Sequence, residues 1–186
     1  MTRAGEGERR RVELVDHSPA WASQARAVAG QVAWALGPIL VDIHHVGSTS
    51  IPGIQAKPVI DMVPVVTHLD TLDAAADILS SLGYVWRGEF GIAGRRYCTL
   101  DDAVTGKRQV QLHAFAVGNP EIHRMLLFRD YLRSHPAEAR AYEAEKDRCR
   151  LLHPDDTGAY AEAKTDWIRA CVARARNAAA TSTRGS

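Results

Sequence analysis

The amino-acid sequence predicts an α+β fold with a helical C-terminal part. As far as residue 117, short apolar and β-rich runs alternate with segments of helical spacing. From Pro120 onward every periodic segment has helical spacing. The chain has 186 residues, of which 46% are hydrophobic, so it can bury one core but hardly two. We therefore expect a single domain over residues 12–176, without internal repeats or long linkers.

The N-terminal half is expected to begin with a helix. Ser18 can cap it, Pro19 suits its first turn, and apolar residues then recur at helical spacing until Gly37-Pro38. Two apolar runs predict buried strands on either side of a turn-rich loop: Ile39–Val46 and Pro58–Val66. Leucines at helical spacing over residues 69–82 predict a second helix, and Gly83 suits its end.

The remaining elements follow from the same patterns. Strands are expected at 84–87, 96–100 and 108–117, with a hairpin turn at 101–107. Helices are expected at 122–133, 136–152 and 156–174. Residues 1–11 are rich in Gly, Glu and Arg, and residues 177–186 carry no periodic apolar positions, so both ends are expected to be flexible tails.

Charge and composition exclude several classes of function. The formal net charge is +1, which gives no bulk electrostatic signature for binding nucleic acid or a membrane surface. Three widely spaced cysteines fit neither a disulfide framework nor a zinc site and indicate a reduced, cytoplasmic setting. No apolar run approaches the roughly 18 residues of a membrane span. An anion-binding surface, if the protein has one, must therefore be local.

The most informative segment is the loop between the first two strands. Gly47 permits close backbone approach, and the N–H groups and hydroxyls of Ser48, Thr49 and Ser50 can surround phosphate oxygens. Lys57 could add a positive charge. An alternative interpretation is that the Gly-Ser-Thr-Ser sequence only caps a short helix.

Asp61 is a carboxylate within an apolar strand. Such a group must face a polar cleft or be paired, because burying an unpaired charge is costly. Carboxylate oxygens are the usual protein ligands of Mg²⁺, which leaves its other positions to water and substrate phosphates. Asp61 is therefore a candidate metal ligand; the alternative is a structural ion pair with an arginine.

His113 is a polar residue in a second apolar strand. Alternation places Gln111, His113 and Phe115 on one face of that strand. If it neighbours the strand of Asp61, the two side chains can converge, and His45 could join them. A lone histidine on a strand is more often a hydrogen-bonded structural group, so the candidate site depends on the combination of all three.

Several basic residues could neutralise an anion. Arg129 and Arg133 lie one helical turn apart and would present two planar forks on one face, which suits phosphate or carboxylate recognition. Further candidates are Arg95, Arg96, Lys146 and Lys164. The alternative for each of them is neutralisation by neighbouring acidic residues on solvated helix faces.

Together these motifs resemble the GrpB family of the nucleotidyltransferase superfamily. The resemblance runs from about Val12 to Ile168. Its first motif is His45-x-Gly47-Ser48-Thr49-Ser50-x-Pro52-Gly53-x-x-Ala56-Lys57-Pro58-x-x-Asp61. Further segments match in order: Gly91-Ile92-Ala93-Gly94-Arg95-Arg96-Tyr97, Leu112-His113, Phe128-Arg129-Asp130-Tyr131-Leu132-Arg133-x-His135-Pro136, and Lys164 in the last helix.

The resemblance implies a nucleotidyltransferase-like mixed sheet flanked by helices, with the Gly-Ser turn at the mouth of a nucleotide cleft. Typical superfamily members hold two Mg²⁺ ions with two alternating carboxylates on one strand and a third from a neighbouring strand. Here the second position is Val63, and His113 takes the third. We therefore expect at most one divalent ion, Mg²⁺ or Mn²⁺, with Zn²⁺ as an option because it accepts imidazole ligands.

Three functions are compatible with these residues. The first is a metal-dependent nucleotidyltransferase-like enzyme that uses a nucleoside triphosphate to modify or activate a small-molecule acceptor, with Asp61, His113 and His45 as catalytic and metal-binding residues. The second is a non-catalytic module that binds a nucleotide or another anion. The third is a metal-dependent hydrolase or lyase-like enzyme in which a histidine acts as general base. The family also occurs joined to dephospho-coenzyme A kinase, which hints at nucleotide or coenzyme metabolism; the sequence names neither acceptor nor oligomeric state.

Overall fold

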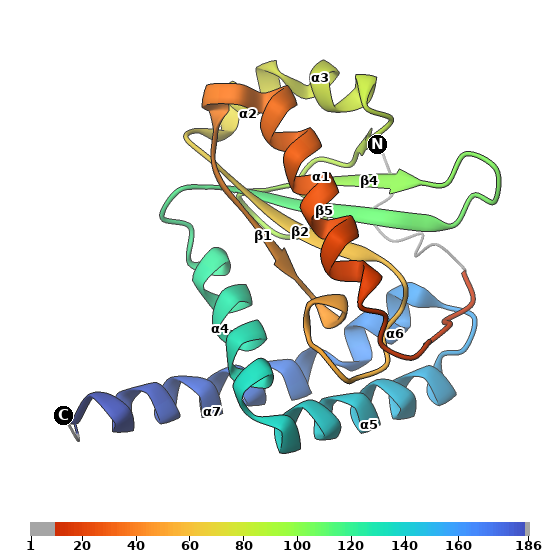
Figure 1. The fold of residues 1–186 in the computed structure, drawn as a ribbon, viewed down its shortest axis with the longest axis vertical. Helices are drawn as coiled ribbons and strands as arrows, with labels where there is room; N and C mark the ends of the chain where they lie inside the picture. The colour runs from red at the N-terminus through yellow and green to blue at the C-terminus, as the bar shows by residue number, and fades with distance from the viewer. Residues whose placement is uncertain (1–9, 185–186) are drawn as a thin grey trace.

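The computed structural model describes residues 10–184, and its centre is a five-stranded mixed sheet (Figure 1). The strands lie in the order β1-β2-β5-β4-β3, in which β2 and β5 are parallel and the other neighbours are antiparallel. Their bounds are β1 Leu40–Val46, β2 Ile60–Val66, β3 Val85–Trp86, β4 Arg95–Asp101 and β5 Arg108–Ala116. This confirms the predicted α+β fold with a mixed sheet.

Seven α-helices accompany the sheet within the described residues. They are α1 Ala20–Leu36, α2 Leu69–Ala74, α3 Ala76–Ser81, α4 Pro120–Ser134, α5 Pro136–Leu152, α6 Thr157–Ala163 and α7 Thr165–Arg184. In the view of Figure 1, α1 crosses in front of the sheet and α4 to α7 lie below it. In residues 10–184 no helix combines the length and apolarity that a membrane span requires.

One face of the sheet forms the main hydrophobic core with α1. The predicted helical stripe, including Val28, Val32 and Leu36, packs on Met62 of β2 and Leu112 of β5. Burial of apolar side chains of this size stabilises the fold by roughly 1.5–3 kcal/mol each. The helix is therefore held by its apolar stripe, as its spacing predicted.

The other face is apolar at one end and polar at the other. Val63, Val65 and Phe115 pack against α4 in a second cluster. Nearer the start of the two parallel strands the same face carries polar residues, because Asp61 pairs in register with Gln111 and His113 lies two residues further along. Parallel pairing thus places the polar residues of β2 and β5 side by side.

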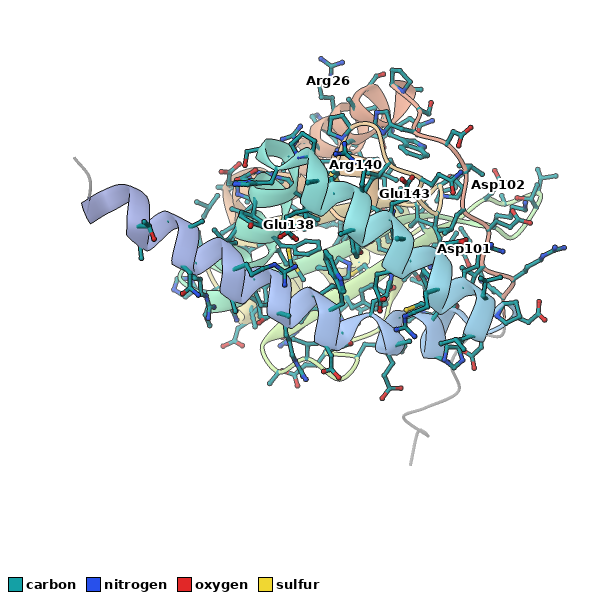
Figure 2. The ribbon with its side chains drawn as sticks, turned by 90° about the horizontal axis from the view of Figure 1, so that it is seen from below. Arg26, Asp101, Asp102, Glu138, Arg140 and Glu143 are labelled. Atoms are coloured by element: carbon teal, nitrogen blue, oxygen red, sulfur yellow. The ribbon has the colours of Figure 1, made fainter. Side chains whose placement is uncertain are left out.

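The C-terminal helices build a third layer against the loop after β1. Ile51 and Ile54 of that loop are buried among residues of α4, α5 and α7. Figure 2, seen from below, shows α5 and α7 across this side, with Glu138 labelled on α5 and Asp101 at the hairpin end of β4. Arg174 of α7 pairs with Glu138 at 2.8 Å and so ties the two helices together.

Three predicted elements differ in the structure. The helix expected over 69–82 is two short helices that meet at Ala75, and the strand expected over 84–87 contains only Val85–Trp86. The last helix divides at Lys164 and continues to Arg184 across much of the expected tail. Alanine at 178–180 has the highest helix propensity, which favours this extension.

The expected N-terminal tail is only partly described. Residues 1–9 lie outside the described part of the chain. Arg10 lies within it and pairs with Asp101 of the β4–β5 hairpin at 2.9 Å, so this residue of the expected tail is held against the domain.

Candidate functional site

Asp61 and His113 form the centre of the candidate site. They lie on the adjacent parallel strands β2 and β5, and His113 Nε2 is 3.5 Å from Asp61 Oδ1. Both side chains are partly buried on the same face of the sheet. The predicted convergence of these two residues is confirmed.

Arg95 orients the His113 ring by contacting the ring nitrogen that does not face Asp61. Its Nη1 lies 3.3 Å from His113 Nδ1, and a guanidinium group can only donate hydrogen bonds. Nδ1 must therefore accept, which places the proton of the neutral ring on Nε2, facing Asp61. In this tautomer His113 donates to the carboxylate; its predicted role as a metal ligand requires the other tautomer, with the proton on Nδ1.

The Gly47 turn lies directly on the Asp61 carboxylate. Gly47 has a φ of 71°, and a Cβ atom there would collide with Asp61 Oδ2 and lie 3.0 Å from its Cβ and Cγ. Glycine thus serves two needs at this position, the positive φ and the close approach of the backbone to the carboxylate. The predicted close approach is present, and its immediate partner is Asp61.

The three hydroxyl groups of the Gly47 turn have different hydrogen-bond partners. Ser50 Oγ donates to Gly47 O at 2.6 Å, and Thr49 Oγ1 donates to Val59 O at 3.2 Å, so both of these buried residues stabilise the loop. Ser48 Oγ lies 3.4 Å from Tyr142 OH at the cavity wall. Of the three predicted phosphate-binding hydroxyls, only that of Ser48 is suitably placed.

His45 lies on the opposite face of the sheet from Asp61, which corrects its predicted role as a catalytic and metal-binding residue. In the antiparallel register Val46 pairs with Asp61 and His45 with Met62, so His45 faces α1. Its Nε2 is 2.9 Å from Thr49 Oγ1, whose own proton goes to Val59 O. Burial lowers the pKa of His45 to about 4, so the ring is neutral and binds the loop at neutral pH.

A cavity of about 160 Å³ lies above Asp61, between the Gly47 turn and the C-terminal helices. Its far wall carries Tyr142 of α5, Tyr160 of α6 and Lys164 at the break between α6 and α7. A second cavity of about 360 Å³ adjoins it through shared residues and reaches His113. The shared lining residues are Lys57, Gln111 and Ala161. The two adjoining cavities are together called the cleft.

Lysines surround this cleft. The ammonium groups of Lys164 and Lys57 lie 4.0 and 5.7 Å from the centre of the Tyr160 ring, within the range of cation–π interaction. The pKa of Lys164 is lowered to about 7, first by burial and then by the positive charges of Lys57 and Lys146, whereas Asp61 opposes this shift. Three lysines thus gather near one carboxylate, which favours an anionic ligand.

Lys146, the third of these lysines, stabilises the loop after β1. Its side chain is only 1% exposed, and its ammonium donates to the backbone carbonyl of Gln55. Burial lowers its pKa to about 8, and Glu143 opposes the shift. Glu143 in turn accepts from the Gln55 N–H at 2.5 Å, so α5 holds the loop at both backbone groups of one residue.

The predicted arginine wall is absent from the cleft. Arg129 pairs with Asp130 at 2.7 Å and donates to the carbonyl of His45 at 3.1 Å, which ties α4 to the end of β1. Arg133 is exposed on α4, and neither residue lines the two cavities. Arg96 lies on the opposite face of β4 and makes a bidentate pair with Asp73 of α2. Arg95 does reach the cleft, but as the partner of His113 described above.

Sequence reasoning assigned no ligand role to several lining residues. Gln111 could have been found, because it alternates with His113 on the same face of β5. Tyr142 and Tyr160 could not have been found in this way. Helical spacing predicts that a residue is buried, but it does not predict which part of the protein that residue contacts. Further lining residues that were missed are Arg87, Phe90, Tyr97 and Arg108.

Asp61 is the only carboxylate among the described residues that line the two cavities. In residues 10–184 no group of three His, Cys, Asp or Glu side chains is arranged to hold a metal. Val63, where the resemblance to the nucleotidyltransferase superfamily leads one to expect a second carboxylate, is fully buried among apolar side chains. Mg²⁺ is often held by one or two carboxylates together with substrate phosphates. Asp61 could thus hold one ion whose remaining ligands come from the substrate.

A family model described as "GrpB protein" matches residues 11–174, nearly the whole described chain. The chain belongs to the GrpB family. A relative from Streptomyces coelicolor, "UPF0157 protein SCO7215", is 34% identical over 165 residues, with 88% of this chain and 84% of the relative covered. The solved GrpB structure from Enterococcus faecalis has a TM-score of 0.81 and 33% identity, with 88% of this chain and 96% of that chain covered. The GrpB fold is therefore shared over almost the full domain.

Some GrpB relatives are longer than this chain. "UPF0157 protein YqkA" of Bacillus subtilis is 38% identical over 168 residues, and the match spans 90% of this chain but 48% of that protein. A "Dephospho-CoA kinase" of Mycobacterium leprae is 28% identical over 187 residues, which span 87% of this chain and 46% of the kinase. Solved Cid1 poly(U) polymerase structures match 63% of this chain at 17% identity and a TM-score of 0.46, a likeness too distant to carry an argument.

Proposed function

We propose that the chain is a metal-dependent nucleotidyltransferase-like enzyme that binds a nucleoside triphosphate in the Asp61 cleft and modifies or activates a small-molecule acceptor. The observation that carries the proposal is a single carboxylate at the base of a cavity that Lys57 and Lys164 line. The lysines can bind the phosphate oxygens of a polyphosphate, and the carboxylate can bind the divalent ion that such a polyphosphate carries in solution.

Each residue of the cleft has a defined part in this proposal. The carboxylate of Asp61 holds one Mg²⁺ or Mn²⁺, and His113, itself oriented by Arg95, donates to the same carboxylate and keeps it in place. The Gly47 turn and the Ser48 hydroxyl lie beside the phosphates. Lys57 and Lys164 neutralise their negative charge. The bound ion would supply electrostatic stabilisation of the charge that develops during phosphoryl chemistry.

Calorimetric titration with Mn²⁺ and a non-hydrolysable nucleoside triphosphate analogue tests the proposal. We expect one ion per chain, and binding should be lost in Asp61→Asn but kept in Asp42→Asn, a matched change at an exposed aspartate of β1. Both variants should unfold at the wild-type temperature, since neither removes an apolar contact. Two ions per chain, or unchanged binding in Asp61→Asn, would contradict the proposal.

A non-catalytic nucleotide-binding module is the second candidate, and the buried Val63 favours it because a carboxylate is replaced by an apolar residue. Product analysis with a labelled triphosphate and a panel of small acceptors separates the two candidates: metal-dependent turnover supports the enzyme, and stoichiometric binding without any product supports the module. For a hydrolase or lyase-like enzyme with His45 or His113 as its base, the geometry leaves only His113, because the His45 ring faces α1 and binds Thr49.

A further inference from the structure

The larger of the two cavities contains a ladder of aromatic rings that leads from the surface to the Asp61 site. Phe90 and Tyr97 have ring centres 5.2 Å apart, and Tyr97 and His113 are again 5.2 Å apart, with interplanar angles of 30° and 35°. The guanidinium carbon of Arg95 lies 4.8 Å from the centre of the Tyr97 ring. The outermost ring, Phe90, is 61% exposed and lines the cavity.

The backbone holds Phe90 in this exposed place under strain. Its φ of 43° is the only positive value at a non-glycine residue among residues 10–184. The buried side chain of Arg95 secures the loop by donating to Phe90 O at 2.6 Å and to Glu89 O at 3.1 Å. Because the ring is exposed, its packing does little to offset the cost of the positive φ. Residues with strained backbone of this kind cluster at ligand sites.

The cavity that Phe90 lines also carries cationic side chains. Arg87, Arg108 and Lys57 line the same cavity. Arg108 also pairs with Asp101 and lies 3.4 Å from Tyr97 OH, so it is anchored beside the ladder. A flat aromatic surface edged by guanidinium groups suits a planar ring that carries a negative group, because the ring can stack while the anion meets the cations.

From this geometry we infer a second ligand site, in which a planar heterocycle stacks on Phe90 and its phosphate lies among Arg87, Arg108 and Lys57. The ligand class is a nucleoside monophosphate. The cavity that holds it adjoins the smaller cavity above Asp61 and shares Gln111 and Lys57 with it. Its use as the acceptor site rests on the proposed function, whereas the binding itself does not.

Calorimetry with adenosine 5′-monophosphate, in EDTA to exclude divalent ions, tests the site on the full chain. Adenosine and ribose 5-phosphate, the two halves of the probe, should each bind at least about fivefold more weakly. Phe90→Ala should weaken binding of the monophosphate by a similar factor. Trp34→Ala, which removes an exposed aromatic side chain on α1 far from the cavity lining, should leave it unchanged. Equal binding to wild type and Phe90→Ala would overturn the inference.

A second variant separates a ligand role of Phe90 from a structural one. Phe90→Gly removes the ring and also relieves the positive φ, so it should bind the monophosphate weakly and yet unfold at a temperature no lower than that of wild type. A Phe90→Gly variant with wild-type affinity would contradict the stacking role.

Asp61→Asn distinguishes failure of this inference from failure of the proposed function. Loss of triphosphate binding with the monophosphate still bound supports two sites. Loss of both would place the monophosphate in the smaller cavity above Asp61 and overturn the second site. Phe90-dependent binding of the monophosphate in a protein that binds no triphosphate would support the second site and refute the proposed function.

Discussion

At the scale of single residues, Gly47 and Asp61 depend on each other. The turn leaves no room for a Cβ atom beside the carboxylate, so any other residue at position 47 must displace Asp61 from His113. This explains physically why a glycine at this point and an aspartate fourteen positions later belong to one motif.

Replacing Gly47 with alanine tests this dependence. Gly47→Ala should cost roughly 1–3 kcal/mol of unfolding free energy through backbone strain and should also abolish binding of Mn²⁺ with nucleotide. Gly53→Ala is the matched control, because Gly53 has a similar φ of 78° but nothing lies near its missing side chain. Urea denaturation and calorimetry should show destabilisation in both variants and loss of binding in Gly47→Ala alone. Binding retained by Gly47→Ala would contradict the close packing on Asp61.

Lys164 predicts a pH dependence of anion binding. Its pKa of about 7 means that the ammonium is charged below pH 7 and neutral above it. Because a phosphate ligand favours the charged form, affinity should fall as pH rises from 6 to 8, by up to about tenfold for one proton. Lys164→Met should remove this part of the profile, whereas Lys107→Met, at an exposed lysine of the hairpin, should keep it. Identical profiles for Lys164→Met and wild type would exclude a phosphate contact.

Alternation within each strand made part of the site predictable. A polar residue among apolar strand neighbours identified Asp61 and His113. His45 was placed wrongly because the face that a residue occupies depends on the register with the next strand, and a shift of one position moves it to the other face. That register cannot be predicted from the sequence of β1 alone.

At the scale of elements, the short helix α6 positions the far wall of the cleft. Its N-cap is Asp156, whose carboxylate accepts from the N–H groups of Gly158 and Ala159 at 2.9 Å each. Its C-cap is Lys164, which still has near-helical backbone angles, so the break was not predictable from a glycine or proline in the sequence. The seven residues of α6 carry Tyr160 and Ala161 to the cleft.

Removing the cap of α6 should therefore affect both stability and binding. Asp156→Ala is expected to cost about 0.5–2 kcal/mol and to weaken nucleotide binding, because Tyr160 and Ala161 lose their fixed position. Asn119→Ala removes the equivalent cap of α4, where Asn119 accepts from Glu121 N at 2.9 Å, away from the cleft. It should show a similar stability loss with unchanged binding. Equal effects of the two variants on affinity would show that α6 does not shape the site.

At the scale of the whole molecule, the fold class and most elements were predictable, and the arrangement of the C-terminal helices was not. Spacing indicates which stripe of a helix is buried, but it does not indicate which surface that stripe meets. Arg129 and Arg133 were therefore expected at the cleft, although α4 packs on the apolar end of the sheet and α5 to α7 cover the polar end. Only tertiary packing distinguishes these two arrangements.

The parallel pairing of β2 with β5 also governs the order of events during synthesis. After Val66 is made, about 50 more residues must follow before β5 is complete, which takes roughly 3–10 s at ribosomal rates. Until then the edge of β2 that pairs with β5 in the folded chain has no partner strand to meet. An unpaired apolar edge of this kind is prone to aggregation, so the parallel pairing that brings Asp61 beside His113 also delays the protection of that edge.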